Sequence, residues 1–91
     1  MATFTAKISI DAGFIKLNFN GDRFLLANAG QSRSRSEQNL KKGKHVVQWF
    51  VEGQPGTFYT LDITSPTSAI TSIKKMIKPI GKDYGSFSFD I

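Results

Sequence analysis

The side chains that could do chemistry in this chain are few. The sequence has no cysteine and one histidine, His45, which excludes a thiolate metal site, a Cys–His pair and a cluster of histidine ligands. A serine triad would need His45 as its base, and this residue directly precedes an apolar run typical of a buried strand. We therefore expect His45 to have a structural or surface role.

The aspartates offer no better basis for catalysis. Asp11 and Asp22 stand at opposite ends of one expected strand, roughly 20 Å or more apart at about 3.3 Å per residue. That separation is too large for a shared proton or a shared calcium ion. No glycine-rich phosphate loop leads from a strand into a helix. We expect neither an enzyme nor a cofactor or metal site.

Basic side chains are the first feature that could mark a binding surface. The chain has 12 Lys and Arg against 7 Asp and Glu, a formal net charge of +5. The candidate basic surface consists of Arg33, Arg35, Lys41, Lys42, Lys44, Lys74, Lys75, Lys78 and Lys82. If its two segments are neighbours, they predict one surface for a polyanion; the alternative is a solvated face that aids solubility. Nucleic acid is disfavoured as a partner, because neither segment contains an aromatic residue for base stacking.

Outward-facing aromatic residues are the second feature. The alternation of side chains places Phe50 and Phe58 on the polar face of a predicted hairpin, and Phe14 joins them if its strand lies in the same sheet. These three residues are the candidate partner face, since exposed apolar clusters usually mark interaction sites. Alternatively, residues 28–43 or 69–80 cover them. A groove lined by aromatic residues and by carboxyl or amide groups would instead favour sugar binding.

The central expected element is a β-hairpin over residues 44–64, with a turn around Gly53-Gln54-Pro55-Gly56. Period-two alternation predicts two inward sets, Val47, Trp49 and Val51 on the first strand and Tyr59, Leu61 and Ile63 on the second. Both sets reach one core only in the register that places Trp49 opposite Leu61.

The rest of the chain also reads mainly as short strands. Residues 3–10, 14–19 and 23–27 predict a three-strand meander, with the hairpin signal Asn20-Gly21 between the last two. Residues 86–91 predict a final strand with Phe87, Phe89 and Ile91 inward.

Two segments are harder to assign. Residues 28–43 predict a long polar surface loop with a short edge strand within residues 32–38. Residues 69–80 fit a strand better than a helix, although their isoleucines also have helical spacing.

Together these elements predict one domain over residues 1–91, a small antiparallel all-β sandwich of about seven strands. The alternative is a β-rich domain with one short helix at 69–80. The segment from Leu40 to Trp49 resembles the corner of immunoglobulin-like and fibronectin type III-like sandwiches, where a leucine, a glycine and an aromatic residue lead into a central strand. His45 stands near the place of the expected corner tyrosine, and the cysteine pair of antibody domains is absent. The resemblance implies an immunoglobulin-like architecture and no particular function.

The expected function is a non-catalytic protein-interaction or structural module whose partner is another protein or a second copy of itself. The alternative is a carbohydrate- or polyanion-binding module. No apolar run approaches the roughly 20 residues of a membrane span, so none is expected. We also expect no signal peptide, because the first residues lack a continuous apolar region; secretion or a periplasmic location would require a leader that has been removed.

Overall fold

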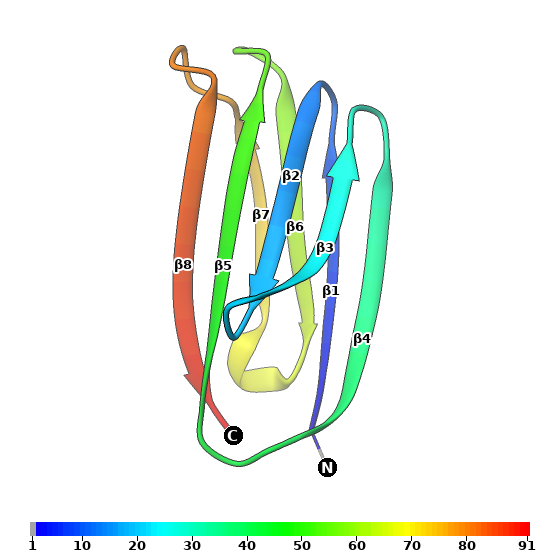
Figure 1. The fold of residues 1–91 in the computed structure, drawn as a ribbon, viewed down its shortest axis with the longest axis vertical. Helices are drawn as coiled ribbons and strands as arrows, with labels where there is room; N and C mark the ends of the chain where they lie inside the picture. Colours follow the sequence, from blue (N-terminus) through cyan, green and yellow to red (C-terminus); the bar gives the residue numbers. More distant parts are fainter. Residues whose placement is uncertain (1) are drawn as a thin grey trace.

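The protein is an all-β sandwich of two four-stranded antiparallel sheets, described over residues 2–91 by a computed structural model (Figure 1). Its strands are β1 (Ala2–Ile10), β2 (Gly13–Phe19), β3 (Asp22–Asn28), β4 (Ser32–Leu40), β5 (Lys44–Gly53), β6 (Phe58–Ser65), β7 (Thr71–Met76) and β8 (Lys82–Asp90). Sheet A has the order β4-β1-β6-β7 and sheet B the order β3-β2-β5-β8. The predicted sandwich is confirmed. Within residues 2–91, no helix is long and apolar enough to cross a membrane.

The core lies between the sheets and is built from alternate residues of each strand. Alternate residues of β1 and β2 are buried, as are the inward sets predicted for β5 and β6; Ile8, Leu17, Val47 and Leu61 all have 0% exposure. Burying such side chains is worth about 25 cal/mol per Å² of apolar surface, which makes this layer the main source of stability.

The predicted central hairpin is wrong, although its inward residues are correct. β5 pairs with β2 and β8, whereas β6 pairs with β1 and β7 in the other sheet. Trp49 therefore lies opposite Leu17 and Gly85 rather than Leu61. The loop over residues 54–57 carries the chain from one sheet to the other. Two strands that face each other across a core bury the same alternation as two neighbours, so the pattern fitted both arrangements.

Two glycines allow the corners between the sheets to touch. Gly13 and Gly53 are register partners, and Gly13 has a φ of +114°. A Cβ atom on Gly13 would lie 2.1 Å from the carbonyl oxygen of Glu52, and one on Gly53 would lie 2.0 Å from that of Ala12. The β1–β2 and β5–β6 connections thus cross in direct backbone contact that only glycine permits.

The predicted meander is correct only for β2 and β3. Their hairpin turns at Asn20-Gly21, with φ values of 53° and 86°. β1 instead pairs with β4 and β6, because the turn after it changes sheet. A register irregularity between β2 and β3 places both Phe24 and Leu25 inward, while Leu26 faces outward. This bulge explains the apolar run in β3.

The two ambiguous segments are both mainly strands. The loop predicted over residues 28–43 is wrong in extent, although its edge strand is correct: β4 runs from Ser32 to Leu40 and is paired along β1. Residues 71–76 form β7, which confirms the preferred strand; the helical portion is a single 3₁₀ turn, η1 (Thr67–Ala69), just before it. Ile77 is buried, whereas Ile70 and Ile80 are exposed, so the helical spacing of the isoleucines reflects no helix.

The structure shows a β-sandwich, and the finer assignment to an immunoglobulin-like fold remains a prediction. In immunoglobulin constant-type domains the sheets are ordered ABED and CFG, so the first two strands are neighbours. Here β1 and β2 belong to different sheets.

Candidate functional site

The predicted partner face is divided between the two outer surfaces of the sandwich. Phe50 and Phe14 point outward from sheet B, on the neighbouring strands β5 and β2. Phe58 points outward from sheet A, where it lies opposite Met76. The prediction that Phe50 and Phe58 share one face is therefore wrong, because β5 and β6 are in different sheets. The conditional prediction that Phe14 joins Phe50 is correct.

The outer face of sheet B carries three ordered rows of side chains. The register across β3, β2, β5 and β8 gives a central row of Leu26, Lys16, Phe50 and Tyr84, flanked by Asn28, Phe14, Glu52 and Lys82 on one side and by Arg23, Asn18, Gln48 and Ser86 on the other. Exposure along the central row is 37% for Leu26, 41% for Phe50 and 78% for Tyr84. Apolar and aromatic surface is thus presented to solvent between two largely polar rows.

Part of this face forms a groove, which we call the aromatic groove. It has a volume of about 170 Å³ and is lined by Phe14, Phe50, Val51, Glu52, Lys82, Asp83 and Tyr84. The Nζ atom of Lys16 lies 5.2 Å from the centroid of the Phe50 ring, a cation–π contact that borders the groove. Aromatic surfaces and groups of both charges therefore converge within one concave site.

Sequence reasoning missed Tyr84 as a member of this site. The segment from Gly81 to Gly85 contains two glycines, a pattern typical of a turn, but β8 already begins at Lys82. The inward phase assigned to Phe87 and Phe89 contained the missing signal, because extending that alternation backwards places Tyr84 outward.

A buried hydrogen-bond network supports the groove from below. The Tyr59 hydroxyl donates to Oδ2 of Asp83 over 2.6 Å, and the backbone N–H of Tyr84 donates to Oδ1 over 2.9 Å. The Asp83 side chain is only 7% exposed, and the Lys78 ammonium group lies 3.8 Å from Oδ1. This carboxylate therefore connects sheet A to the start of β8 and holds the backbone beside Tyr84.

The network shifts the acid–base properties of both partners. Burial raises the pKa of Tyr59 well above its ordinary value, and the adjacent Asp83 carboxylate raises it further. Burial alone would also raise the pKa of Asp83. The hydrogen bonds from Tyr59 and the Tyr84 N–H, together with the charges of Lys78 and Lys75, outweigh burial and hold that pKa below its usual value.

Replacing Asp83 with asparagine should lower the free energy of unfolding by about 1–3 kcal/mol near neutral pH, because asparagine leaves one donor without its acceptor. A depressed pKa stabilises the fold above the unfolded-state value of about 3.9 and ceases to do so as the pH falls through the folded-state value. The difference between wild type and Asp83→Asn should therefore shrink on acidification. Urea unfolding across this pH range measures it, with the exposed Asp22→Asn as the control. A pH-independent difference would contradict the assignment.

The basic residues do not form one surface, and that prediction is wrong. Arg33 and Arg35 lie on β4 and Lys74 and Lys75 on β7, the opposite edges of sheet A, with β1 and β6 between them. The β4–β5 connection, which bears Lys41, Lys42 and Lys44 at or beside it, lies at the other end of the sandwich from the β7–β8 connection with Lys78 and Lys82 (Figure 1). Sequence proximity could not reveal the strand order that separates them. Lys82 alone reaches the aromatic groove.

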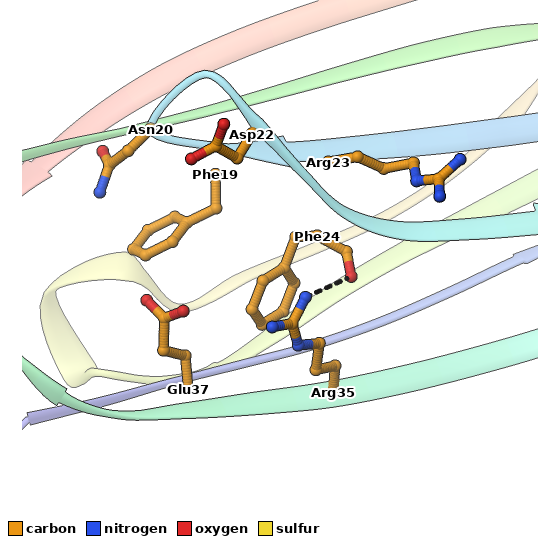
Figure 2. A pocket seen from close by; sticks show the side chains of 7 residues that line it. All are labelled: Phe19, Asn20, Asp22, Arg23, Phe24, Arg35 and Glu37. Carbon is orange, nitrogen blue, oxygen red and sulfur yellow. Dashed lines mark hydrogen bonds between the residues drawn. The ribbon is translucent and has the colours of Figure 1, made fainter.

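A second hollow lies where the edges of β3 and β4 meet, and Figure 2 shows its side chains. It has a volume of about 270 Å³ and is lined by Phe19, Asn20, Asp22, Arg23, Phe24, Arg35 and Glu37. The Arg35 guanidinium group lies 4.6 Å from the centroid of the Phe24 ring and donates to the Phe24 carbonyl oxygen over 3.2 Å. Two acids and two arginines balance in charge, and Arg35 acts mainly as a cover over the edge of the core.

His45 has a structural role, as expected. It is 7% exposed and packs against the rings of Phe19 and Phe89, whose centroids each lie 5.5 Å from that of the imidazole. Nε2 donates to the carbonyl oxygen of Lys41 over 2.7 Å, and Nδ1 accepts from the Asn20 amide over 2.9 Å. Both ring nitrogens are thus engaged in holding the β2–β3 turn and the β4–β5 loop together.

The fold and this groove define the class of the protein as a small β-sandwich with an exposed aromatic groove on one sheet. Residues 2–91 contain no group of three or more His, Cys, Asp or Glu side chains placed to hold a metal ion. Comparisons with known protein families, curated proteins and solved structures found no match.

Proposed function

We propose that the protein is a non-catalytic carbohydrate-binding module that holds a sugar on the outer face of sheet B. The observation that carries the proposal is the convergence of Phe14, Phe50 and Tyr84 with Glu52 and Lys82 in one groove. The Phe50–Phe58 cluster that would have favoured a protein partner is instead split between opposite faces of the sandwich.

The chemistry of the groove matches the two kinds of surface on a sugar. The C–H faces of a sugar ring are apolar and can lie on aromatic rings, while its hydroxyl groups need donors and acceptors at the ring edge. Phe50 and Tyr84 supply the aromatic surface, and each is at least 41% exposed. Glu52 can accept hydrogen bonds and Lys82 can donate them from the next row, with Gln48 available on the other side.

The groove is also rigid where binding requires it. Its aromatic residues stand on adjacent strands of one sheet, and the Asp83 network fixes the backbone at Tyr84. A platform ordered before binding loses little conformational entropy when a ligand arrives. This arrangement favours recognition of a ligand surface over catalysis, for which the groove lacks a nucleophile paired with a base.

The test is binding to a panel of neutral oligosaccharides and polysaccharides, measured by calorimetry and by affinity electrophoresis. Phe50→Ala and Tyr84→Ala should each weaken binding at least about tenfold, the effect of losing about 1.4 kcal/mol of contact energy. Both positions are exposed, so thermal stability should change little. Phe58, a phenylalanine of similar exposure on the opposite sheet, provides the matched control, and Phe58→Ala should bind as wild type.

Three results would overturn the proposal: no binding to any sugar in the panel, equal loss in the Phe58→Ala control, or binding confined to heparin. In the last case the logarithm of affinity would fall linearly with the logarithm of salt concentration, and the site would be a polyanion surface instead.

A further inference from the structure

The four sheet edges of the sandwich are not equally protected. Free edges invite pairing with other strands, and natural proteins block them with charges, bulges or covering segments. The edge strand β4 carries two arginines and a glutamate, β7 carries two lysines, and β3 has Asp22 and Arg23 beside its bulge. In β8, the stretch from Tyr84 to Phe89 contains no charged residue. We propose that β8 pairs antiparallel with β8 of a second copy of the chain, which joins two B sheets into one.

The backbone of β8 has hydrogen-bonding groups aimed at such a partner. Gly43 and Ile91 exchange hydrogen bonds of 3.0 and 3.3 Å, and Gly53 donates to Gly81 over 2.9 Å. Because these pairs alternate along an antiparallel ladder, the odd-numbered residues of β8 bond to β5. The N–H and C=O groups of Ser86 and Ser88 therefore point away from the sheet.

At both ends of this edge, outward backbone groups are hydrogen-bonded within the same chain. The N–H of Tyr84 donates to the Asp83 carboxylate, and the carbonyl oxygen of Asp90 accepts a hydrogen bond from the Ser68 hydroxyl over 3.3 Å. Among residues 2–91, no such side-chain contact reaches the outward groups of Ser86 or Ser88. A pairing site is thus left at the middle of β8, where a twofold axis can stand.

One register makes the strand complementary to itself. With Phe87 on the twofold axis, Ser86 faces the partner subunit's Ser88 and exchanges two hydrogen bonds with it, and the reverse pair adds two more. Phe89 then lies opposite the partner subunit's Gly85, a large residue beside a small one. Asp90 lies diagonal to the partner subunit's Lys82, within reach of an ion pair formed twice.

The pairing has a consequence for ligand binding that depends on the proposed function. A twofold axis through paired β8 strands runs perpendicular to the joined sheet, so both aromatic grooves open on the same side. A dimer would then engage two sugars of one polymer, with avidity above that of a single groove.

The first test is the oligomeric state in solution, measured by sedimentation velocity over a range of protein concentrations. The wild type should form dimers, whereas Ser88→Pro should be a monomer, because proline removes an outward N–H without breaking the ladder to β5. Ser88→Ala keeps that N–H and is the matched control, expected to dimerise. A wild type that remains monomeric throughout, or a dimer that survives Ser88→Pro, would overturn the proposal.

A second variant keeps the proposal testable if proline disturbs folding. The chain has no cysteine, so Phe87→Cys introduces a single thiol on the twofold axis. Facing residues of a non-hydrogen-bonded pair have Cα atoms about 4.5 Å apart, within the range of a disulfide. Phe87→Cys should form a covalent dimer on mild oxidation, whereas Ser34→Cys on β4 should not. Equal cross-linking of both variants would contradict β8 pairing. That result would not affect the test of sugar binding, which can be made on the monomer.

Discussion

Replacing Trp49 with alanine should lower the free energy of unfolding by about 3–5 kcal/mol, the range for truncating a large core aromatic residue. Trp49 is 7% exposed and lies between Leu17 and Gly85 on the neighbouring strands. Its ring also meets the ring of Phe87 edge-on, with centroids 6.2 Å apart. Removing the indole would open a cavity that these strands cannot close without shifting. Urea unfolding followed by circular dichroism measures the loss.

The opposite residue provides a specific control for this prediction. A Cβ atom on Gly85 would lie 2.2 Å from Cζ2 of Trp49, so Gly85→Ala must displace the indole and should cost about 1–3 kcal/mol. In a Trp49→Ala background the clash is absent, and the added methyl group should then cost little. A double-mutant cycle isolates this coupling. Additive effects of the two changes would show that Gly85 matters for some reason other than its contact with Trp49.

The relation between Trp49 and its neighbours also shows what the sequence could reveal. Alternation identifies the face on which a side chain lies, and it placed Trp49 and Leu61 correctly inward. It carries no information on which strand lies beside which, since facing strands and adjacent strands bury the same pattern. Whether these two strands are adjacent or face each other depends on the path of residues 54–57 and on the close contact of two glycines. Hydrophobic periodicity encodes neither.

Edge strands and candidate sites were predicted less well for a related reason. β4 buries almost no apolar side chain, so its sequence lacks the apolar alternation that would reveal the full length of the strand, and backbone pairing with β1 determines its conformation. The aromatic groove was half predicted. Phe14 and Phe50 were identified from their outward phase, but Tyr84 was hidden in an apparent turn. The distribution of basic residues depended wholly on the strand order, which local sequence does not specify.

An aromatic cluster at the other end of the sandwich should be as important for stability as Trp49. Phe4 has 0% exposure and comes from sheet A. Its ring stacks on Phe19 with centroids 4.1 Å apart and an interplanar angle of 6°, and it meets the ring of Phe24 edge-on at 5.1 Å. A further stacked contact joins it to Phe89 at 6.0 Å. These three partners belong to sheet B, so the packing of Phe4 against them holds the two sheets together.

Phe4→Ala should therefore lower the free energy of unfolding by about 3–5 kcal/mol, whereas Phe4→Leu, which keeps most of the volume, should cost less than about 1.5 kcal/mol.

The location of Phe4 also allows effects on stability to be separated from effects on sugar binding. Phe4 is near the end of the sandwich at which the chain begins, while β5 ends and β8 begins beside the aromatic groove at the opposite end (Figure 1). Folded Phe4→Ala protein should bind sugar as wild type does, and Phe50→Ala should show the reverse, with stability kept and binding lost. Unfolding curves measure the stability of both variants, and binding isotherms measure their affinity for sugar. Loss of sugar affinity in folded Phe4→Ala would mean that the groove depends on the distant aromatic cluster, and that sheet B does not act as the rigid platform described above.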